Sequence, residues 1–132
     1  IVDIVSSVTG LSFVDKDLDQ GELGGLVTWS APSDSSQVTQ YDIYFSFTPD
    51  GIIRSHVGSV AVGTNLVGID ANCPISAYQQ VIVYTRSALA EQSTPVGFSL
   101  TDTQASVTDL AFSDVDEDMD LLGGFVTWTP PS

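Results

Sequence analysis

Short runs of alternating apolar and polar residues, separated by turn residues, recur along the chain. In one such run Tyr41, Ile43 and Phe45 alternate with polar positions, which places the three side chains on one face of a strand. This period of two predicts strands and not helices. The expected strands are residues 8–14, 23–30, 39–47, 53–60, 66–69, 79–87 and 96–100, with turns at 32–36, 49–51, 63–65, 72–74 and 93–95.

The apolar positions of these strands define a candidate core. Val27 and Trp29 share one strand face, and Val96, Phe98 and Leu100 share another. A tryptophan inside an alternating strand is typical of a core, although an exposed binding aromatic is the alternative. The Gly24–Gly25 pair predicts a bulge or a close approach of strands, because no helix follows it to form a phosphate site. The expected fold class is all-β, a seven-stranded antiparallel β-sandwich.

An internal repeat divides the chain. Residues 7–33 align without a gap with residues 106–132, at an offset of 99 residues, which is the size of one small sandwich. We therefore expect 1–6 to be the end of the last strand of a preceding repeat, 7–105 to be one complete sandwich, and 106–132 to be the first two strands of the next repeat. Both ends then fall inside a tandem array. The repeats could form a string of separate beads, or the overhanging segments could pack into neighbouring copies.

The composition narrows the classes of partner. A chain of 132 residues with 42% hydrophobic residues has room for one domain and enough apolar surface to fold. Three Lys and Arg residues against 17 Asp and Glu residues give a net charge of −14, which repels phosphate backbones and anionic lipids. The longest uncharged apolar stretch, residues 57–69, is too short to span a bilayer. We expect no nucleic acid partner and no membrane insertion.

Several signals along the repeat resemble the fibronectin type III family. They are Trp29 with Pro32, repeated by Trp128 with Pro131, Tyr41 in the third strand, and Ser93-Thr94-Pro95-Val96 before the last. The resemblance covers about Val8 to Leu100 and implies a modular, non-catalytic domain that is extracellular or at the cell surface. No Arg-Gly-Asp tripeptide is present, so integrin-type adhesion is not implied.

Acidic residues concentrate between the first two expected strands of each repeat copy. Alternating carboxylates repel one another and favour a bound cation, and oxygen ligands of this kind suit Ca²⁺. The loop is not an EF-hand, because Gly21 falls at the seventh position and not at the sixth, Leu26 stands at the twelfth position where a glutamate is required, and no helices flank the loop. The alternative is a solvated acidic turn that keeps the protein soluble. The candidate ligands are Asp15, Asp17, Asp19, Glu22, Asp114, Asp116, Asp118 and Asp120.

The resemblance also implies a position for this loop. In a type III-like topology the loop after the first strand faces the next module, so a bound Ca²⁺ would stiffen the joint between modules. Asp70 from the same pole and Glu91 from a neighbouring module are further candidate ligands.

Candidate catalytic groups are sparse. The single His56 and the single Cys73 lie on segments with no evident partner, and nucleophilic catalysis needs a base within hydrogen-bond reach. The carboxylates gather on one loop and not across a cleft, which argues against a glycosidase. No cluster of His and Cys offers zinc ligands. We expect that the protein is not an enzyme and that Cys73 is a buried, inert thiol.

These observations favour a structural role. The expected function is a repeat module of an extracellular fibre or surface filament, assembled by end-to-end contacts with neighbouring copies or repeats of the same protein. The first alternative is an adhesive or ligand-binding stalk module of a cell-surface protein, with a glycan or protein ligand. The second is an accessory domain of a secreted enzyme.

Overall fold

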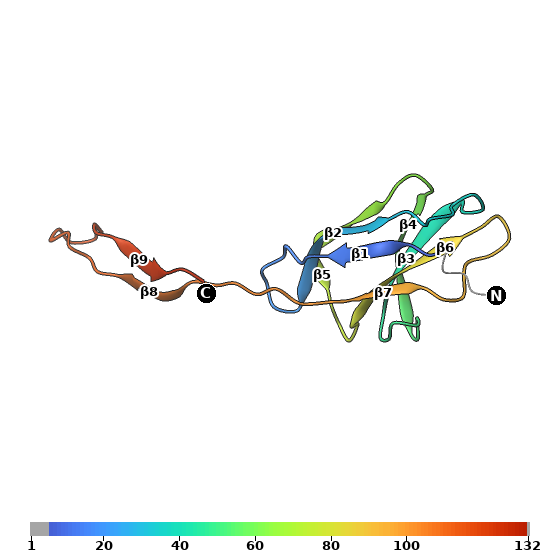
Figure 1. Ribbon diagram of the computed structural model, residues 1–132. Helices are drawn as coiled ribbons and strands as arrows, with labels where there is room; N and C mark the ends of the chain where they lie inside the picture. Colours follow the sequence, from blue (N-terminus) through green and yellow to red (C-terminus); the bar gives the residue numbers. More distant parts are fainter. Residues whose placement is uncertain (1–5, 132) are drawn as a thin grey trace.

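The computed structural model describes residues 6–131. These residues form an all-β structure with antiparallel sheets, which confirms the predicted fold class at that level. Two sheets face each other as in a β-sandwich, and a two-stranded hairpin extends away from them (Figure 1). The strands are β1 (Thr9–Phe13), β2 (Glu22–Ser30), β3 (Gln40–Ser46), β4 (Arg54–Ala61), β5 (Leu66–Pro74), β6 (Gln80–Arg86), β7 (Val96–Ser99), β8 (Thr108–Phe112) and β9 (Val126–Thr129).

The core lies between a sheet of order β1-β2-β5 and a sheet of order β4-β3-β6-β7. Val27 and Trp29 of β2 face Tyr41 and Ile43 of β3, and all four side chains are buried as the alternating pattern predicted. The rings of Trp29 and Tyr41 meet edge to face with centroids 5.4 Å apart. This contact joins the two sheets at the centre of the sandwich.

Strand β5 is longer than predicted. The sequence placed its end at Ile69 and a turn at 72–74, but the strand continues to Pro74. Asn72 has a φ of 65°, and the pairing of β2 with β5 shifts by two positions near it, between Leu23↔Cys73 and Gly25↔Ile69. The predicted turn is therefore wrong, because Asn72 adopts the left-handed conformation inside a bulge and pairing with β2 resumes beyond it.

The hairpin of β8 and β9 repeats β1 and β2. Phe112 pairs with Val126 as Phe13 pairs with Val27, and both pairs of strands carry an irregularity at the same place. Strand β9 has four residues where β2 has nine, because the first half of β2 is paired with β5 and β9 has no such neighbour. Residues 100–107 lead from the sandwich to this hairpin (Figure 1). The strand end expected at residues 1–6 lies, apart from Ser6, outside the described residues.

Candidate functional site

The acidic loop between β1 and β2 is folded by its own carboxylates. The backbone N–H of Asp17 donates to Asp15 Oδ1 at 2.9 Å, and the N–H of Asp19 donates to Asp17 Oδ1 at 3.0 Å. These consecutive Asx turns are a structure that alternating aspartates form locally. The segment is therefore curled and not a straight strand, so the carboxylates of alternate residues approach one another.

A glycine fixes where this loop returns to the sheet. Gly25 has a φ of 149°, and a Cβ atom at this position would lie 2.6 Å from the carbonyl oxygen of Val14. The N–H of Lys16 donates to the carbonyl of Gly24 at 2.6 Å at the same place, where the two ends of the loop come together and form its neck. The expectation of a close backbone approach at the Gly24–Gly25 pair is confirmed, and a larger residue at Gly25 would push the two chain segments apart.

Asp15 is the buried anchor of the loop. Its Oδ1 accepts from the N–H groups of Asp17 and Gly24, the latter at 3.1 Å, and its Oδ2 accepts from the N–H of Thr103 at 2.8 Å. A carboxylate offers about four acceptor sites, so three of them are used on backbone donors. Of the predicted metal ligands, Asp15 is thus the one with the least capacity left for an ion.

Three other predicted ligands come together. One carboxylate oxygen each from Asp17, Asp19 and Glu22 lies within 4.8 Å of the others. Oxygen ligands sit about 2.3–2.6 Å from Ca²⁺, so two ligands of one ion are separated by at most about 5 Å. The spacing fits one cation, and within residues 6–131 this is the one group of three such side chains at that separation.

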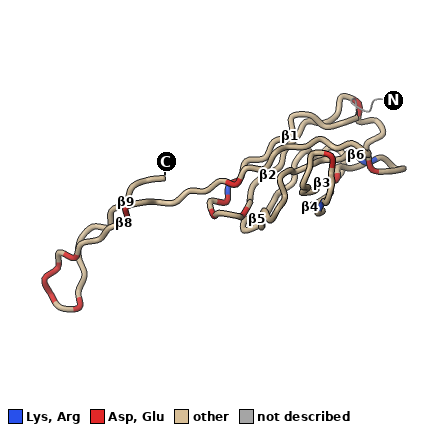
Figure 2. The backbone as a smooth tube through the Cα atoms, turned by 90° about the horizontal axis from the view of Figure 1, so that it is seen from below, with Lys and Arg blue, Asp and Glu red and all other residues tan. Residues whose placement is uncertain are grey.

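The second copy of the loop has the same backbone and a different set of side chains. Asp114 Oδ1 accepts from the N–H of Asp116 at 2.9 Å, and Asp116 Oδ1 accepts from the N–H of Asp118 at 2.8 Å. The residue equivalent to Glu22 is Leu121, so one carboxylate is missing. Asp120 stands at the position of Gly21 in the first copy. The loop forms the acidic tip of the hairpin (Figure 2).

The linker that follows β7 lies on the first acidic loop. Asp102 Oδ2 accepts from the N–H of Gly21 at 2.7 Å, and the N–H of Ala105 donates to the carbonyl of Leu18 at 3.2 Å. The other oxygen of Asp102, Oδ1, is buried without a hydrogen-bond partner among the described residues. With the bond from Thr103 to Asp15, these contacts hold the joint between the sandwich and the hairpin.

Asp102 was missed as a candidate in the sequence. The signal that could have found it is Asp3, which stands at the equivalent position one repeat earlier. Of the two further expected ligands, Asp70 lines a cavity between β4 and β5, and Glu91 of this unit bonds to Arg54 on the outer face of the four-stranded sheet. Neither belongs to the group of Asp17, Asp19 and Glu22. The role of Glu91 from a neighbouring module stays a prediction.

A polar network covers the outer face of the sheet formed by β4, β3, β6 and β7. Arg86 Nε contacts Asp42 Oδ2 at 2.8 Å, and Ser59 Oγ donates to Asp42 Oδ1 at 2.8 Å. Burial raises the pKa of Asp42, but its neighbours, among them the hydrogen-bond donors Gln40, Arg86 and Ser59, outweigh burial and bring it to about 2. Asp42 is therefore a charged, structural group across the ordinary range of pH.

Tyr44 and Glu91 form the second half of this network. The Tyr44 hydroxyl donates to Glu91 Oε2 at 2.8 Å, and the Arg54 guanidinium lies 4.2 Å from the centre of the Tyr44 ring. Burial, together with the hydrogen bond and charge of Glu91, raises the pKa of Tyr44 to about 12. Because Asp42 and Glu91 balance Arg86 and Arg54, the network carries no surplus charge from these four groups.

The single histidine belongs to the same network, but the order of its hydrogen-bonded groups, His56, Ser59 and Asp42, does not activate a nucleophile. His56 Nε2 lies 2.9 Å from Ser59 Oγ, and that hydroxyl donates its own proton to Asp42. In a catalytic triad the histidine stands between the carboxylate and the hydroxyl, whereas here the hydroxyl stands in the middle. The arrangement can orient the His56 ring but gives the hydroxyl no strong base.

His56 and Cys73 both line the cavity between β4 and β5, which has a volume of about 400 Å³. Burial, with a contribution from the charge of Asp70, raises the pKa of the Cys73 thiol. A raised pKa keeps the sulfur protonated, and the thiolate is the reactive form. The cavity is otherwise lined mainly by apolar side chains, among them Phe45, Val57, Ile69 and Tyr78.

Comparisons with known proteins give no further assignment. No protein family matches this chain, and no curated protein is similar to it. None of the residues in 6–131 belongs to a helix long and apolar enough to cross a membrane.

Proposed function

We propose that the chain is a structural repeat module of an extracellular fibre or surface filament. Its units are seven-stranded sandwiches of the fibronectin type III-like kind, arranged in a tandem array and joined end to end. The partners are neighbouring copies or repeats of the same protein, and the module is not an enzyme.

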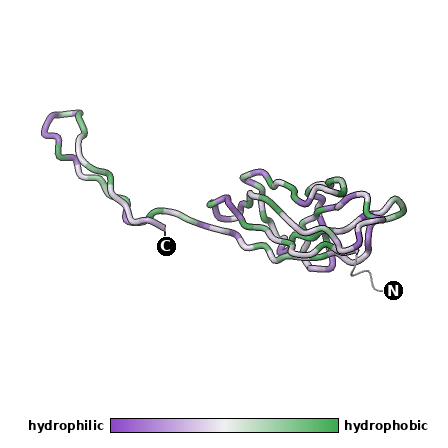
Figure 3. Tube along the Cα trace, turned by 45° about the horizontal axis from the view of Figure 1, so that its top comes forward, coloured by the Kyte–Doolittle hydropathy of each residue, from purple (hydrophilic) through white to green (hydrophobic). Residues whose placement is uncertain are grey.

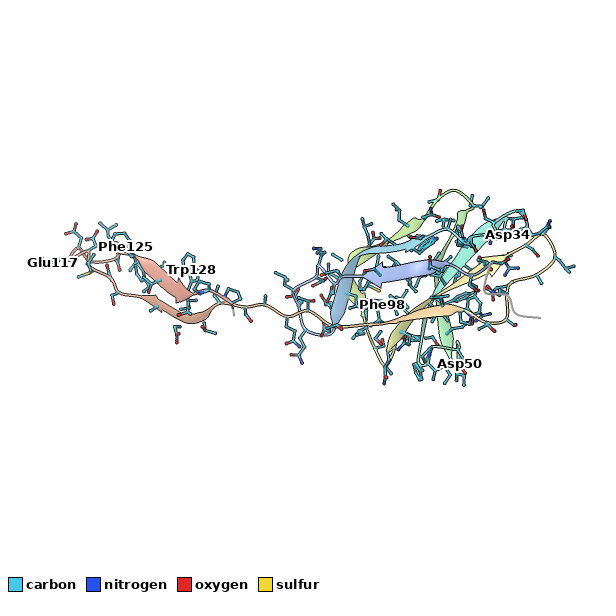
Figure 4. The ribbon with its side chains drawn as sticks, in the orientation of Figure 1. Asp34, Asp50, Phe98, Glu117, Phe125 and Trp128 are labelled. Atoms are coloured by element: carbon cyan, nitrogen blue, oxygen red, sulfur yellow. The ribbon has the colours of Figure 1, made fainter. Side chains whose placement is uncertain are left out.

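One observation carries this proposal: the hairpin of β8 and β9 exposes the side chains that its equivalent buries. Trp29 is 5% exposed and its equivalent Trp128 is 56% exposed, while Leu23 is fully buried and Leu122 is 77% exposed. Trp128 and Phe125 lie on the hairpin, separate from the sandwich (Figure 4). An apolar face of this kind marks an interaction surface.

The first copy indicates what fits against this face. The side chains of β1 and β2 are covered by β3 and β6, and the free edge of β2 is paired with β5. The same chemistry in β8 and β9 calls for a surface like that of β3 to β7, supplied by the repeat that these two strands begin or by a neighbouring copy. A series of such units, joined end to end through an anchored linker, is what favours a fibre over a solitary domain.

The joint favours an ordered array and not freely moving beads. The linker is held by Asp15, Asp102 and Leu18, all within or beside the first acidic loop. We include Ca²⁺ in the proposal, bound by Asp17, Asp19 and Glu22, where it would offset the repulsion of three carboxylates and stiffen the joint. Asp102 Oδ1, which is buried and has no hydrogen-bond partner among the described residues, supports cation binding beside this loop.

The alternative function is an adhesive or ligand-binding stalk module of a cell-surface protein. The observation that favours it is the pair Tyr44 and Tyr84 on the outer face of the four-stranded sheet, with Arg54 lying over both rings. Aromatic rings and a guanidinium on one face suit a glycan or protein ligand. Their polar atoms are largely paired with Glu91, so we rank this function second.

Electron microscopy of a chain with several consecutive repeats tests the proposal. We expect ordered fibres with a regular axial spacing, which loosen when a chelator removes Ca²⁺. Separate flexible beads, unchanged by the chelator, would contradict the filament and favour the stalk.

A further inference from the structure

Another cavity lies at the end of the sandwich that is far from the hairpin. Its volume is about 210 Å³, which is smaller than the roughly 300–1,000 Å³ of a typical ligand pocket and suits a few side chains of a protein segment. The loop after β6 reaches this end of the sandwich (Figure 1), and hydrophobic residues lie at its tip (Figure 3).

The chemistry of this cavity suits an acidic occupant. No acidic residue among those that the structure describes lines it, although the chain has a net charge of −14. Glu91 is next in the chain to two lining residues, but it is engaged on the outer face of the sheet by Tyr44 and Arg54. Hydroxyl, amide and guanidinium groups can all donate to a carboxylate. The cavity has such groups from Ser6, Gln37, Thr85, Arg86, Ser87 and Gln92.

The internal repeat places a neighbour beside this cavity. The N–H of Ala105, in the linker, donates to the carbonyl of Leu18 at the tip of the first acidic loop, at 3.2 Å. Ser6 is the equivalent of Ala105 one repeat earlier. In a tandem array Ser6 therefore meets the acidic loop of the preceding repeat. Because Ser6 also lines the cavity, that loop and the cavity lie next to each other.

The segment that contains Ser6 is fixed to the wall of the cavity. Gln92 Nε2 donates to Ser7 Oγ at 3.0 Å, and Thr85 Oγ1 donates to Gln92 Oε1 at 2.9 Å. The equivalent of Ser7 in the next repeat is Ser106, which directly follows Ala105. One short segment thus contacts the acidic loop of one module and the cavity wall of the next.

We propose that this cavity receives the tip of the acidic loop of the preceding repeat, an inference that rests on the tandem array of the proposed function. Asp19 and its equivalent Asp118 are exposed at this tip. Asp15 and Asp17 accept backbone hydrogen bonds, whereas the carboxylate of Asp19 accepts none within residues 6–131. A carboxylate has two oxygens, so Asp19 can meet a donor in the cavity and still face a cation.

The two contacting surfaces lie at opposite ends of one sandwich. The acidic loop and the linker lie at the end that bears the hairpin, and the cavity lies at the other end (Figure 1). A contact between two different surfaces repeats head to tail, which extends an array. The contact also covers two apolar side chains: Leu18 at the tip is 52% exposed, and Leu89, next to Ala90 of the cavity, is 95% exposed.

Disulfide trapping tests the contact in the full chain with its complete repeat, residues 7–105, present twice in succession. Leu18→Cys in the first copy is combined with Gln37→Cys in the second, and Cys73→Ser removes the native thiol from both. Mass spectrometry after mild oxidation should show a disulfide that forms at least tenfold faster than in the control. The control carries Val62→Cys in place of Gln37→Cys, in the turn between β4 and β5 at the same end of the sandwich. Equal rates, or no disulfide in either variant, would overturn the proposal.

Small-angle X-ray scattering of the same duplicated chain tests the chemistry of the cavity. Gln37→Glu in the second copy adds a carboxylate to the cavity without changing its size. Gln79→Glu makes the same change at the opposite end of that module, and it serves as the matched control. At low salt, where like charges are weakly screened, Gln37→Glu should turn a rigid pair of modules into a flexibly linked pair. If neither variant changes the scattering, the acidic loop does not occupy the cavity.

Fibre formation is scored separately from the joint. Trapping is carried out with a chelator present, which separates this contact from the Ca²⁺ of the proposed function. Trapping without fibres in electron microscopy would contradict only the proposed filament. Fibres without trapping would overturn only the joint.

Discussion

The hairpin of β1 and β2 and the hairpin of β8 and β9 are two copies of one sequence in two environments. Their loops share the same Asx turns, and their necks share one hydrogen bond, from Lys16 to Gly24 in the first and from Val115 to Gly123 in the second, each 2.6 Å long. Gly25 and Gly124 have φ values of 149° and 153°. The backbone of the loop and neck is therefore set by local sequence.

Burial and strand length differ between the copies. In the first, β5 pairs with β2 from Glu22 to Thr28, and the facing sheet covers the apolar side chains of β2. In the second, the same apolar positions are exposed, and β9 starts at Val126, five residues after Leu121, the equivalent of Glu22. The comparison shows that local turns form without a core, whereas a long strand needs a neighbour to accept its hydrogen bonds.

Replacement of the two equivalent tryptophans should give the largest difference in the free energy of unfolding between the two hairpins. Trp29→Ala should lower the free energy of unfolding by about 3–5 kcal/mol, because it leaves a cavity against Tyr41. Trp128→Ala should change the free energy of unfolding by less than about 0.5 kcal/mol, since the Trp128 side chain is exposed. Urea denaturation followed by tyrosine and tryptophan fluorescence measures both. Similar losses for both variants would show that the second hairpin is also packed in solution.

Replacement of the first aspartate of each acidic loop should give the next largest difference in stability. Asp15→Ala leaves three backbone N–H groups without their acceptor and should cost about 2–3 kcal/mol. Asp114→Ala removes two exposed hydrogen bonds and should cost less than about 1 kcal/mol. Chemical denaturation gives the two values, and hydrogen exchange at Thr103 reports whether the linker is released. An unchanged Thr103 amide in Asp15→Ala would contradict its anchoring role.

Acid should weaken the sandwich through Asp42. The folded pKa of Asp42, about 2, lies below the ordinary value of 3.8. Its contribution is therefore present above pH 3.8 and is lost as the pH falls through 2, by on the order of 1–2 kcal/mol after allowing for the exposed Arg86. Asp42→Asn should flatten the dependence of stability on pH in this range. A slope that remains in the variant would assign the effect to other carboxylates.

The smallest expected effect is that of Ca²⁺. At about ten times its dissociation constant, one bound ion should stabilise the chain by about 1.4 kcal/mol. Titration calorimetry should give one ion per chain and not two, because Leu121 replaces Glu22 in the second loop. Glu22→Gln should weaken the binding, and Glu117→Gln, in the exposed tip, serves as the control. Two equivalent ions, or no difference between the variants, would contradict the site.

The alternation of apolar and polar residues predicted much of the sandwich but not the length of its edge strand β5. Burial of Val27, Trp29 and Tyr41 followed from alternation, because a strand between two layers must turn one face inward. The end of β5 was wrong, since a bulge at Asn72 has the same local signature as a turn. Only the partner strand distinguishes the two.

The candidate site was predicted in part. Asp17, Asp19 and Glu22 were named from their spacing, and the structure brings them together. The use of Asp15 on backbone donors and the approach of Asp102 were not foreseen. Both depend on where the linker runs, and residues 81 and 88 positions apart meet only through the folded sandwich.

The sequence by itself determined the strand periodicity, the repeat and the backbone of both acidic loops, because these depend on neighbouring residues and on the conformations open to glycine and aspartate. Only the tertiary structure decided which copy of each apolar residue is buried, how far β2 and β5 extend, and which carboxylates anchor the linker. Burial and sheet hydrogen bonds need a partner distant in the chain, and similar sequences receive different partners in the two copies.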